Sequence, residues 1–146
     1  MPIALATSDA DILACFPILH ELRPHLVESA FVPQVRRMQP DGYQLAVLRD
    51  DTGIQAVAGF RVYENLHSGR MLYVDDLVTS SASRSSGHGG ALLNWLADHG
   101  RAQQCASLEL DSGTHRAEAH RFYFRERMRI TDYHFARLLG DQAARA

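Results

Sequence analysis

Apolar positions follow two spacings along the chain, a helical period and a strict alternation, and each change of spacing predicts a new element. Helical spacing recurs in four stretches: 8–26, 24–39, 90–104 and 115–128. Strand-like runs occupy most of the remainder: 2–7, 43–50, 54–64, 70–80, 105–112 and 130–139. In chain order these elements read β-α-α-β-β-β-α-β-α-β, an α/β (α+β mixed) class in which helices flank a central mixed sheet.

Turn residues and helix-end residues refine this pattern. Ser8 is suited to cap the first helix, Pro17 predicts a kink or break inside it, and Pro33 interrupts the second helical stretch. The run "DDTG" at 50–53 predicts a hairpin, so the three central strands form a mostly antiparallel meander. No repeat or linker divides the chain, and we expect a single domain over residues 1–146.

Composition narrows the class of protein. The 146 residues are 46% hydrophobic and carry a formal net charge of -2, which favours a single core and argues against a nucleic-acid partner bound by a broad basic face. The first residues lack a basic leader, and no apolar run suits a membrane span, so we expect no membrane contact and a cytoplasmic location. Cys15 and Cys105 lack metal-ligand spacing, which predicts free thiols and no metal.

A glycine-dense loop precedes the third helical stretch. Gly87, Gly89 and Gly90 lie where a strand passes into a helix, and Arg84 stands at the loop entrance. Bare backbone beside a helix N-terminus suits an anion such as phosphate, although three glycines can also simply form a tight turn. The loop ends in Gly-Ala-Leu where a Walker A loop needs Gly-Lys-Ser/Thr, and its G-x-G-G spacing departs from a dinucleotide fingerprint.

Three segments in order resemble the GCN5-related N-acetyltransferase (GNAT) family. The pattern Arg84-x-x-Gly87-x-Gly89 resembles that family's R/Q-x-x-G-x-G/A signature. The run "LYVDDLVT" before it resembles the family's fourth strand, and "AHRFYFRERM" after it resembles the A-x-x-F-Y-x-x-x-G-F segment. The resemblance extends from about residue 54 to residue 138 and implies a GNAT-like fold with acetyl-coenzyme A (acetyl-CoA) as the ligand.

The resemblance also implies which residues hold acetyl-CoA. Its pyrophosphate would contact the glycine loop and its pantetheine arm would lie along the fourth strand, as an added strand would. The implied residues are Leu77, Val78, Thr79, Arg84, Ser85, Ser86, Gly87, His88, Gly89, Gly90, Ala91 and Arg116. Arg116 stands where the family commonly has asparagine, and Arg127 stands where it has glycine, which predicts a strained residue or a different helix exit.

Acetyl transfer to an amine needs a proton donor for the leaving thiolate and a neutral amine. Tyr123 matches the family's general acid, although its helical spacing also suits the core. Asp75 and Asp76 are candidates to receive the amine's proton, directly or through water, or to bind a cationic substrate; a structural role is the alternative.

Strict alternation would place Leu72, Val74, Asp76 and Val78 on one face and Met71, Tyr73, Asp75 and Leu77 on the other. The family's bulge here would break this alternation and leaves open which aspartate faces the site.

The resulting expectation is an N-acetyltransferase acting on a primary amine of a small molecule or protein. The carboxylates of Asp75, Asp76, Glu109 and Asp111 mildly favour a cationic acceptor. A non-catalytic acyl-CoA sensor with the same fold is the alternative, and retention of Tyr123 favours the enzyme. The family further suggests a homodimer that uses the terminal strand as a contact.

Overall fold

The computed structural model describes residues 2–140, and the chain falls into two compact units, Met1–Leu110 and Asp111–Ala146. The first unit holds a five-stranded sheet with the order β1-β2-β3-β4-β5. The second unit holds the helix α5 (Ala117–Arg125) and the chain that follows it. The expectation of one domain over 1–146 stays a prediction.

The first unit alternates helices and strands largely as the apolar spacing predicts. Its elements are β1 (Ile3–Leu5), α1 (Asp9–Ala14), α2 (Phe16–Leu22), α3 (Glu28–Met38), the 3-10 turn η1 (Gln39–Asp41), β2 (Gln44–Asp50), β3 (Gly53–Asn65), β4 (Gly69–Thr79), the 3-10 turn η2 (Ser81–Ser83), α4 (His88–Ala102) and β5 (Ser107–Leu110). Strands β1 to β4 pair antiparallel, and β4 pairs parallel with β5. This confirms the predicted fold class, a mostly antiparallel mixed sheet flanked by helices.

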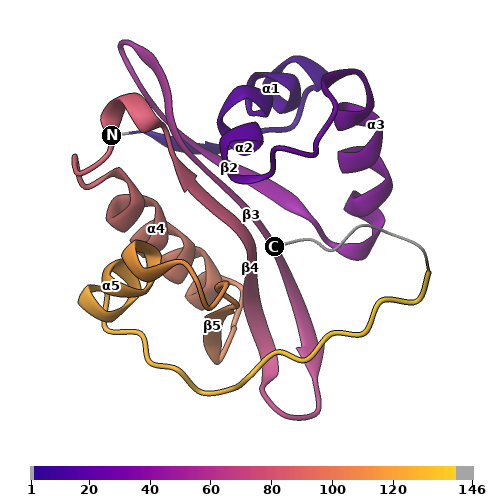
Figure 1. Cartoon of the computed structure of the whole chain (residues 1–146), viewed down its shortest axis with the longest axis vertical. Helices are drawn as coiled ribbons and strands as arrows, with labels where there is room; N and C mark the ends of the chain where they lie inside the picture. The colour runs from indigo at the N-terminus through magenta and orange to yellow at the C-terminus, as the bar shows by residue number, and fades with distance from the viewer. Residues whose placement is uncertain (1, 141–146) are drawn as a thin grey trace. The chain divides into compact units, whose positions relative to one another are not determined.

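Two apolar layers enclose the sheet of the first unit (Figure 1). Helices α1 to α3 cover one face, where Ile12, Phe31 and Val78 share a core cluster. Helix α4 covers the other face, where Leu92 and Leu96 pack on the opposite side of the same strands. Burial of both faces explains why the central part of β3 consists entirely of buried residues.

The N-terminal helices differ from the sequence expectation at one proline. Ser8 caps α1 through its side chain, and the helix break predicted at Pro17 is confirmed, because α1 ends at Ala14 and Pro17 lies in the first turn of α2. Pro33, by contrast, lies inside α3 without ending it. Its missing N–H would have bonded the carbonyl of Ser29 in the first turn, so the helix loses one hydrogen bond and continues. The region therefore holds three helices where two were expected.

The second unit contradicts the predicted final strand over 130–139. The described residues after α5 contain no strand, and Ile130, Tyr133, Phe135 and Leu139 are largely exposed. Alternating apolar residues make a segment suitable for pairing, but a strand forms only when another strand supplies its hydrogen bonds.

Helix α5 ends with a residue in the left-handed conformation. Arg127, which stands where the family has glycine, has φ 64°, so of the two predicted outcomes the strained residue is the one observed. The N–H of Met128 donates to the carbonyl of Tyr123, and the N–H of Arg127 donates to that of Phe124. These two bonds form a Schellman motif, whose geometry requires the positive φ.

Both cysteines are free, as predicted, and burial raises the pKa of Cys15 to about 12. Within residues 2–140, no helix is both long and apolar enough to cross a membrane. The same residues contain no cluster of three or more His, Cys, Asp or Glu side chains that could hold a metal ion.

Candidate active site

A β-bulge separates Asp75 from its neighbour in β4. Gly59 of β3 pairs with Asp76, whereas the next residue, Phe60, pairs with Val74, so Asp75 is the extra residue. Because a bulge shifts the alternation by one position, Asp75 and Asp76 both project from the face that carries α1 to α3. Neither aspartate therefore points to the α4 face.

Asp76 is held by two residues from distant parts of the chain. The Tyr43 hydroxyl donates to Oδ2 of Asp76 at 2.8 Å, and Nε of Arg23 donates to Oδ1 at 3.0 Å. These bonds give each carboxylate oxygen a donor, and the Asp76 side chain is only 15% exposed. Burial, followed by the charge of Asp76, raises the pKa of Tyr43 well above 10, which keeps the phenol protonated as a donor.

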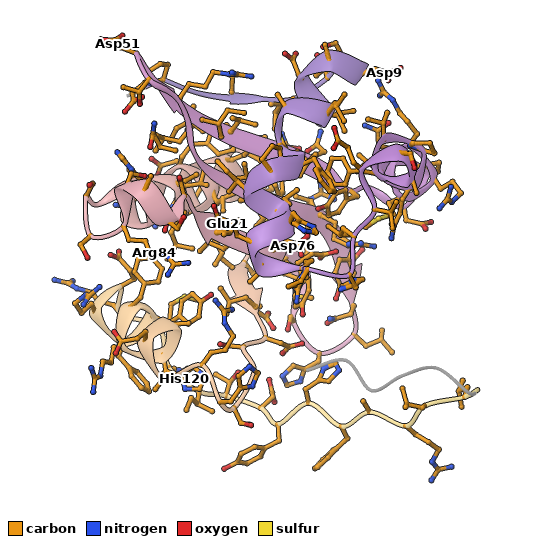
Figure 2. The ribbon with its side chains drawn as sticks, turned by 45° about the horizontal axis from the view of Figure 1, so that its top comes forward. Asp9, Glu21, Asp51, Asp76, Arg84 and His120 are labelled. Carbon is orange, nitrogen blue, oxygen red and sulfur yellow. The ribbon has the colours of Figure 1, made fainter. Side chains whose placement is uncertain are left out.

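Arg23 also fixes the bulge through its main chain. It caps the C-terminal end of α2, and its Nη2 donates to the carbonyl oxygen of Asp75 at 3.0 Å. One guanidinium therefore joins the end of α2 to both residues of the bulge. Figure 2 shows Asp76 on the sheet beside this end of the helix.

Asp75 has a different environment from Asp76. Its Oδ2 accepts from Nη2 of Arg61 at 2.6 Å, and its Oδ1 accepts from Nε at 3.3 Å. Asp75 also lines a pocket together with Arg61, Tyr63, Tyr73 and Asp41. Burial raises the pKa of Asp75 above 3.8, because the nearby Arg61 only partly offsets the desolvation of the carboxylate. Asp75 thus borders this pocket, and its side chain is 20% exposed.

Strand β4 loses its parallel partner at the bulge. Its pairing with β5 runs from Met71↔Ser107 to Val74↔Leu110 and ends there. The following segment, Asp76–Thr79, still pairs with β3, and no strand among the described residues pairs with its other edge. Alternate N–H and C=O groups along that edge are oriented to accept an added extended ligand. This segment includes Leu77, Val78 and Thr79, which the family resemblance implies as contacts of the pantetheine arm.

The glycine loop follows directly and forms the N-terminus of α4. Gly87 is the N-cap residue with φ 80°, and Ser85 also has a positive φ of 67°. Ala91 is the first residue whose N–H bonds back into the helix, to the carbonyl of Gly87, so the N–H groups of His88, Gly89 and Gly90 lack intrahelical acceptors. A Cβ added at Gly87 would meet no atom within 4 Å, which leaves space for a ligand close to the backbone. The loop thus fits an anionic group such as pyrophosphate.

Two polar atoms in this segment are buried without a hydrogen-bond partner among the described residues. They are Oγ of Ser83 and Nδ1 of His88. His88 is buried, so its backbone N–H rather than its ring is available to a ligand. On the other side of the loop, the carboxylate of Glu21 accepts from the N–H and the hydroxyl of Ser81. These bonds tie α2 to the loop that carries Arg84 (Figure 2).

The remaining predicted site residues lie in the second unit. Tyr123 is on α5, where its ring packs against Phe122 with centroids 5.4 Å apart. Arg116 precedes the first turn of the same helix as its N-cap residue, but its side chain makes no capping bond. Asp111 forms an ion pair with His134 at 3.1 Å when the imidazole is protonated. In the first unit, Glu109 accepts from the Ser107 hydroxyl.

Sequence reasoning missed three residues of this site: Arg23, Tyr43 and Arg61. Arg23 and Asp76 are 53 positions apart, and Tyr43 and Asp76 are 33 apart, so no local spacing links them. Arg61 offered a better signal, because it lies in an apolar strand predicted to pair with the strand of Asp75. An unpaired charge in such a strand requires an opposite charge nearby.

Comparison with known proteins identifies the class. The model of the acetyltransferase (GNAT) family matches residues 11–128. An uncharacterized N-acetyltransferase of Bacillus subtilis (strain 168), YhdJ, is 34% identical over 118 residues, which cover 80% of this chain and 83% of the relative. A solved structure described as a transcriptional regulator from Bacillus halodurans C-125 has a TM-score of 0.83 at 19% identity, covering 94% of this chain and 99% of its own. The aminoglycoside N-acetyltransferase AAC(6')-Iy, solved with CoA, has a TM-score of 0.81 at 11% identity, covering 95% and 96%.

The fold and the matched sequence therefore define an acetyltransferase-type α/β protein. The chain belongs to the GNAT family. This confirms the resemblance drawn from the three sequence segments, and the family uses acetyl-CoA.

Proposed function

We propose that the protein is an acetyl-CoA-dependent N-acetyltransferase acting on a primary amine. The observation that carries the proposal is the sequence of features along one stretch of chain: the bulge, the unpaired edge of β4, and the glycine-rich start of α4. In this order the features suit the acetyl thioester, the pantetheine arm and the pyrophosphate of acetyl-CoA. Membership of the GNAT family supports the same reading.

The first step is binding of acetyl-CoA by the chain. We assign the pantetheine arm to the main chain of Leu77, Val78 and Thr79, and the pyrophosphate to the loop from Arg84 to Ala91. Arg84 would add a charge-assisted bond, and the free N–H groups at the start of α4 would supply the remaining donors. Arg116 is a further proposed contact, in place of the family's asparagine.

Bound acetyl-CoA supplies an activated acetyl thioester, and the chain supplies proton movement and orientation. Asp75 accepts the proton of the amine at a carboxylate oxygen, directly or through water, because it borders the pocket. Asp76 positions the bulge through Tyr43 and Arg23. A main-chain N–H of the bulged segment stabilises the charge that develops on the acetyl oxygen. The Tyr123 hydroxyl donates its proton to the leaving sulfur, since the pKa of a phenol is close to that of the thiol that forms.

The test is release of free thiol from acetyl-CoA in the presence of a panel of amines, with hydrolysis in the absence of amine subtracted. Amine-dependent release above that background supports the enzyme. Tight acetyl-CoA binding without any amine-dependent release would instead favour the alternative, a non-catalytic acyl-CoA sensor.

A homodimer is also part of the proposal. The exposed apolar side chains of residues 130–139 support it, because a run of this kind left in water marks an interaction surface. Light scattering on the full chain and on a Tyr133→Ser, Phe135→Ser variant tests it. We expect a dimer for the parent protein and a monomer for the variant.

A further inference from the structure

A pocket of about 480 Å³ opens on the face of the sheet that carries α1 to α3. Its lining consists of Asp41, Arg61, Tyr63, Tyr73 and Asp75, all in the first unit. The volume lies within the range of small-molecule sites. Because Asp75 lines the pocket, the pocket lies next to the bulge.

The sheet register explains why four of these side chains converge. Arg61 pairs directly with Tyr73, and residues opposite each other on antiparallel strands project from the same face. Tyr63 and Asp75 each lie two residues further along the same strands, so they share that face. Asp41 comes from η1, which ends at Gly42 with φ 92° before the chain enters β2.

The charges in the pocket are unequal. Arg61 and Asp75 neutralise each other through two hydrogen bonds, and the Arg61 guanidinium also lies 5.6 Å from the centre of the Tyr43 ring. Among the described residues, the exposed Asp41 carboxylate has no ion-pair partner of its own. One carboxylate is therefore in excess, beside two tyrosine rings whose faces attract cations.

A carboxylate or phosphate on the ligand fits this arrangement poorly. Among the described lining residues, Arg61 is the only basic group, and its Nε and Nη2 already bind Asp75. An anion would therefore compete with Asp75 for the guanidinium, and the Asp41 carboxylate would repel it. A positive group, by contrast, would be attracted by the exposed Asp41 carboxylate and by the faces of the tyrosine rings.

We propose that this pocket selects, as acetyl acceptor, a small amine that carries a second, positively charged group held by Asp41, Tyr63 and Tyr73. The inference rests on the proposed function and adds the substrate class to it. The reacting amine lies toward Asp75 and the bulge, and the second cation lies toward Asp41. Tyr63 and Tyr73 contact the apolar linker between the two nitrogens.

The test compares two acceptors of the same shape that differ in one charge. (4-Aminobutyl)trimethylammonium carries a permanent cation, and 5,5-dimethylhexylamine replaces its quaternary nitrogen with carbon. A series of linker lengths accompanies both, with the matching aminocarboxylates as anionic probes. We expect kcat/KM for the cation to exceed that for the neutral isostere by about fivefold, from one exposed ion pair and one cation–π contact.

Substitutions in the pocket test which residues cause the preference for the cationic acceptor. Asp41→Asn should lower the ratio of cation to neutral kcat/KM by about threefold, and Asp41→Lys should shift preference toward the aminocarboxylate. Asp51→Asn is the matched control, because Asp51 is an exposed carboxylate of the β2–β3 turn outside the pocket (Figure 2). It removes the same charge, and the ratio should stay at its parent value. Tyr63→Leu, at a partly exposed position, should also lower the ratio.

Binding provides a second readout that does not depend on turnover. Calorimetric titration of the protein without acetyl-CoA should show tighter binding of the cation than of its neutral isostere, with the difference reduced in Asp41→Asn. Equal affinities and equal kcat/KM for the two probes would overturn this inference while leaving the acetyltransferase proposal intact. Failure to acetylate any amine, with selective cation binding retained, would overturn the acetyltransferase proposal instead.

Discussion

The hydroxyl of Tyr43 lies across Gly59 and donates to Asp76 Oδ2 at 2.8 Å. A Cβ on Gly59 would overlap the Tyr43 hydroxyl and come within 2.7 Å of that carboxylate oxygen. Gly59 is also the residue that pairs with Asp76 at the bulge. Its missing side chain is what allows the phenol to reach the aspartate.

Gly59→Ala should therefore lower the free energy of unfolding by about 1–3 kcal/mol, because the added methyl overpacks the Tyr43–Asp76 contact. Urea denaturation of the full chain measures it. In a Tyr43→Phe background the hydroxyl is gone, and the same substitution should cost less. Equal costs in the two backgrounds would show that the hydroxyl does not restrict Gly59.

Asp75→Asn and Asp76→Asn should have unequal effects. Asp76→Asn removes the charge that Arg23 and Tyr43 bind and should cost about 1–2 kcal/mol of stability. Asp75→Asn should mainly affect turnover: the parent should lose activity as the pH falls through the raised pKa of Asp75, and the variant should lack this acidic limb. Stability curves and pH profiles of kcat/KM check both. Profiles identical to the parent in both variants would exclude a proton-accepting role for either residue.

Gly89→Asp should weaken acetyl-CoA binding by at least about tenfold, since a carboxylate would repel the pyrophosphate at the start of α4. The fold should survive, because an aspartate near a helix N-terminus is favourable to the helix itself. Asn94→Asp adds the same charge at an exposed position further along α4 and is the control. Calorimetry should separate the two variants, and unchanged affinity in Gly89→Asp would remove the loop from the cofactor site.

Tyr123→Phe should lower kcat by roughly 10²–10⁴-fold, the usual range for a positioned proton donor. Acetyl-CoA affinity should change much less, because the proton is needed only as the bond to sulfur breaks. Tyr133→Phe is the control, because it removes the hydroxyl of a largely exposed tyrosine and keeps the apolar ring assigned to the proposed dimer surface. Near-equal kcat values for Tyr123→Phe and the parent, with chemistry rate-limiting, would leave Tyr123 a packing role.

Arg127→Gly should raise the free energy of unfolding by about 1 kcal/mol, because glycine adopts the left-handed conformation without the Cβ clash. Arg125→Gly, two residues earlier within α5, should lower stability by about the same amount, since glycine is a poor helix former. Denaturation of both variants tests the pair. Destabilisation by Arg127→Gly would show that the arginine side chain contributes more than the strain it causes.

Much of the fold could be predicted because it depends on short-range patterns. Alternation identified the central strands, and a proline in the first helical turn identified the break before α2. The same rules failed where the outcome depends on position within an element or on a partner. Pro33 lies early enough in α3 to remove a single bond, and the apolar run of 130–139 has no strand beside it among the described residues.

The candidate site likewise combines features with local sequence signatures and contacts between distant residues. Its loop and its two aspartates have local signatures, so the sequence found them. The bonds that distinguish Asp75 from Asp76 come from Arg23, Tyr43 and Arg61, which only the folded sheet brings together. Their identification required three-dimensional contacts rather than spacing.

The single extra residue at Asp75 reverses which face of the sheet the even-numbered residues of β4 occupy. Before it, the even-numbered Leu72 and Val74 face α4; after it, the even-numbered Val78 packs with α1 to α3 and the odd-numbered Leu77 packs with the α4 layer. The two halves of one strand thus obey opposite rules for which positions tolerate a polar residue. A one-residue deletion at Asp75 would restore a uniform rule and expose the wrong side chains along the whole downstream half, so we expect length, more than residue identity, to be the constrained property of this strand.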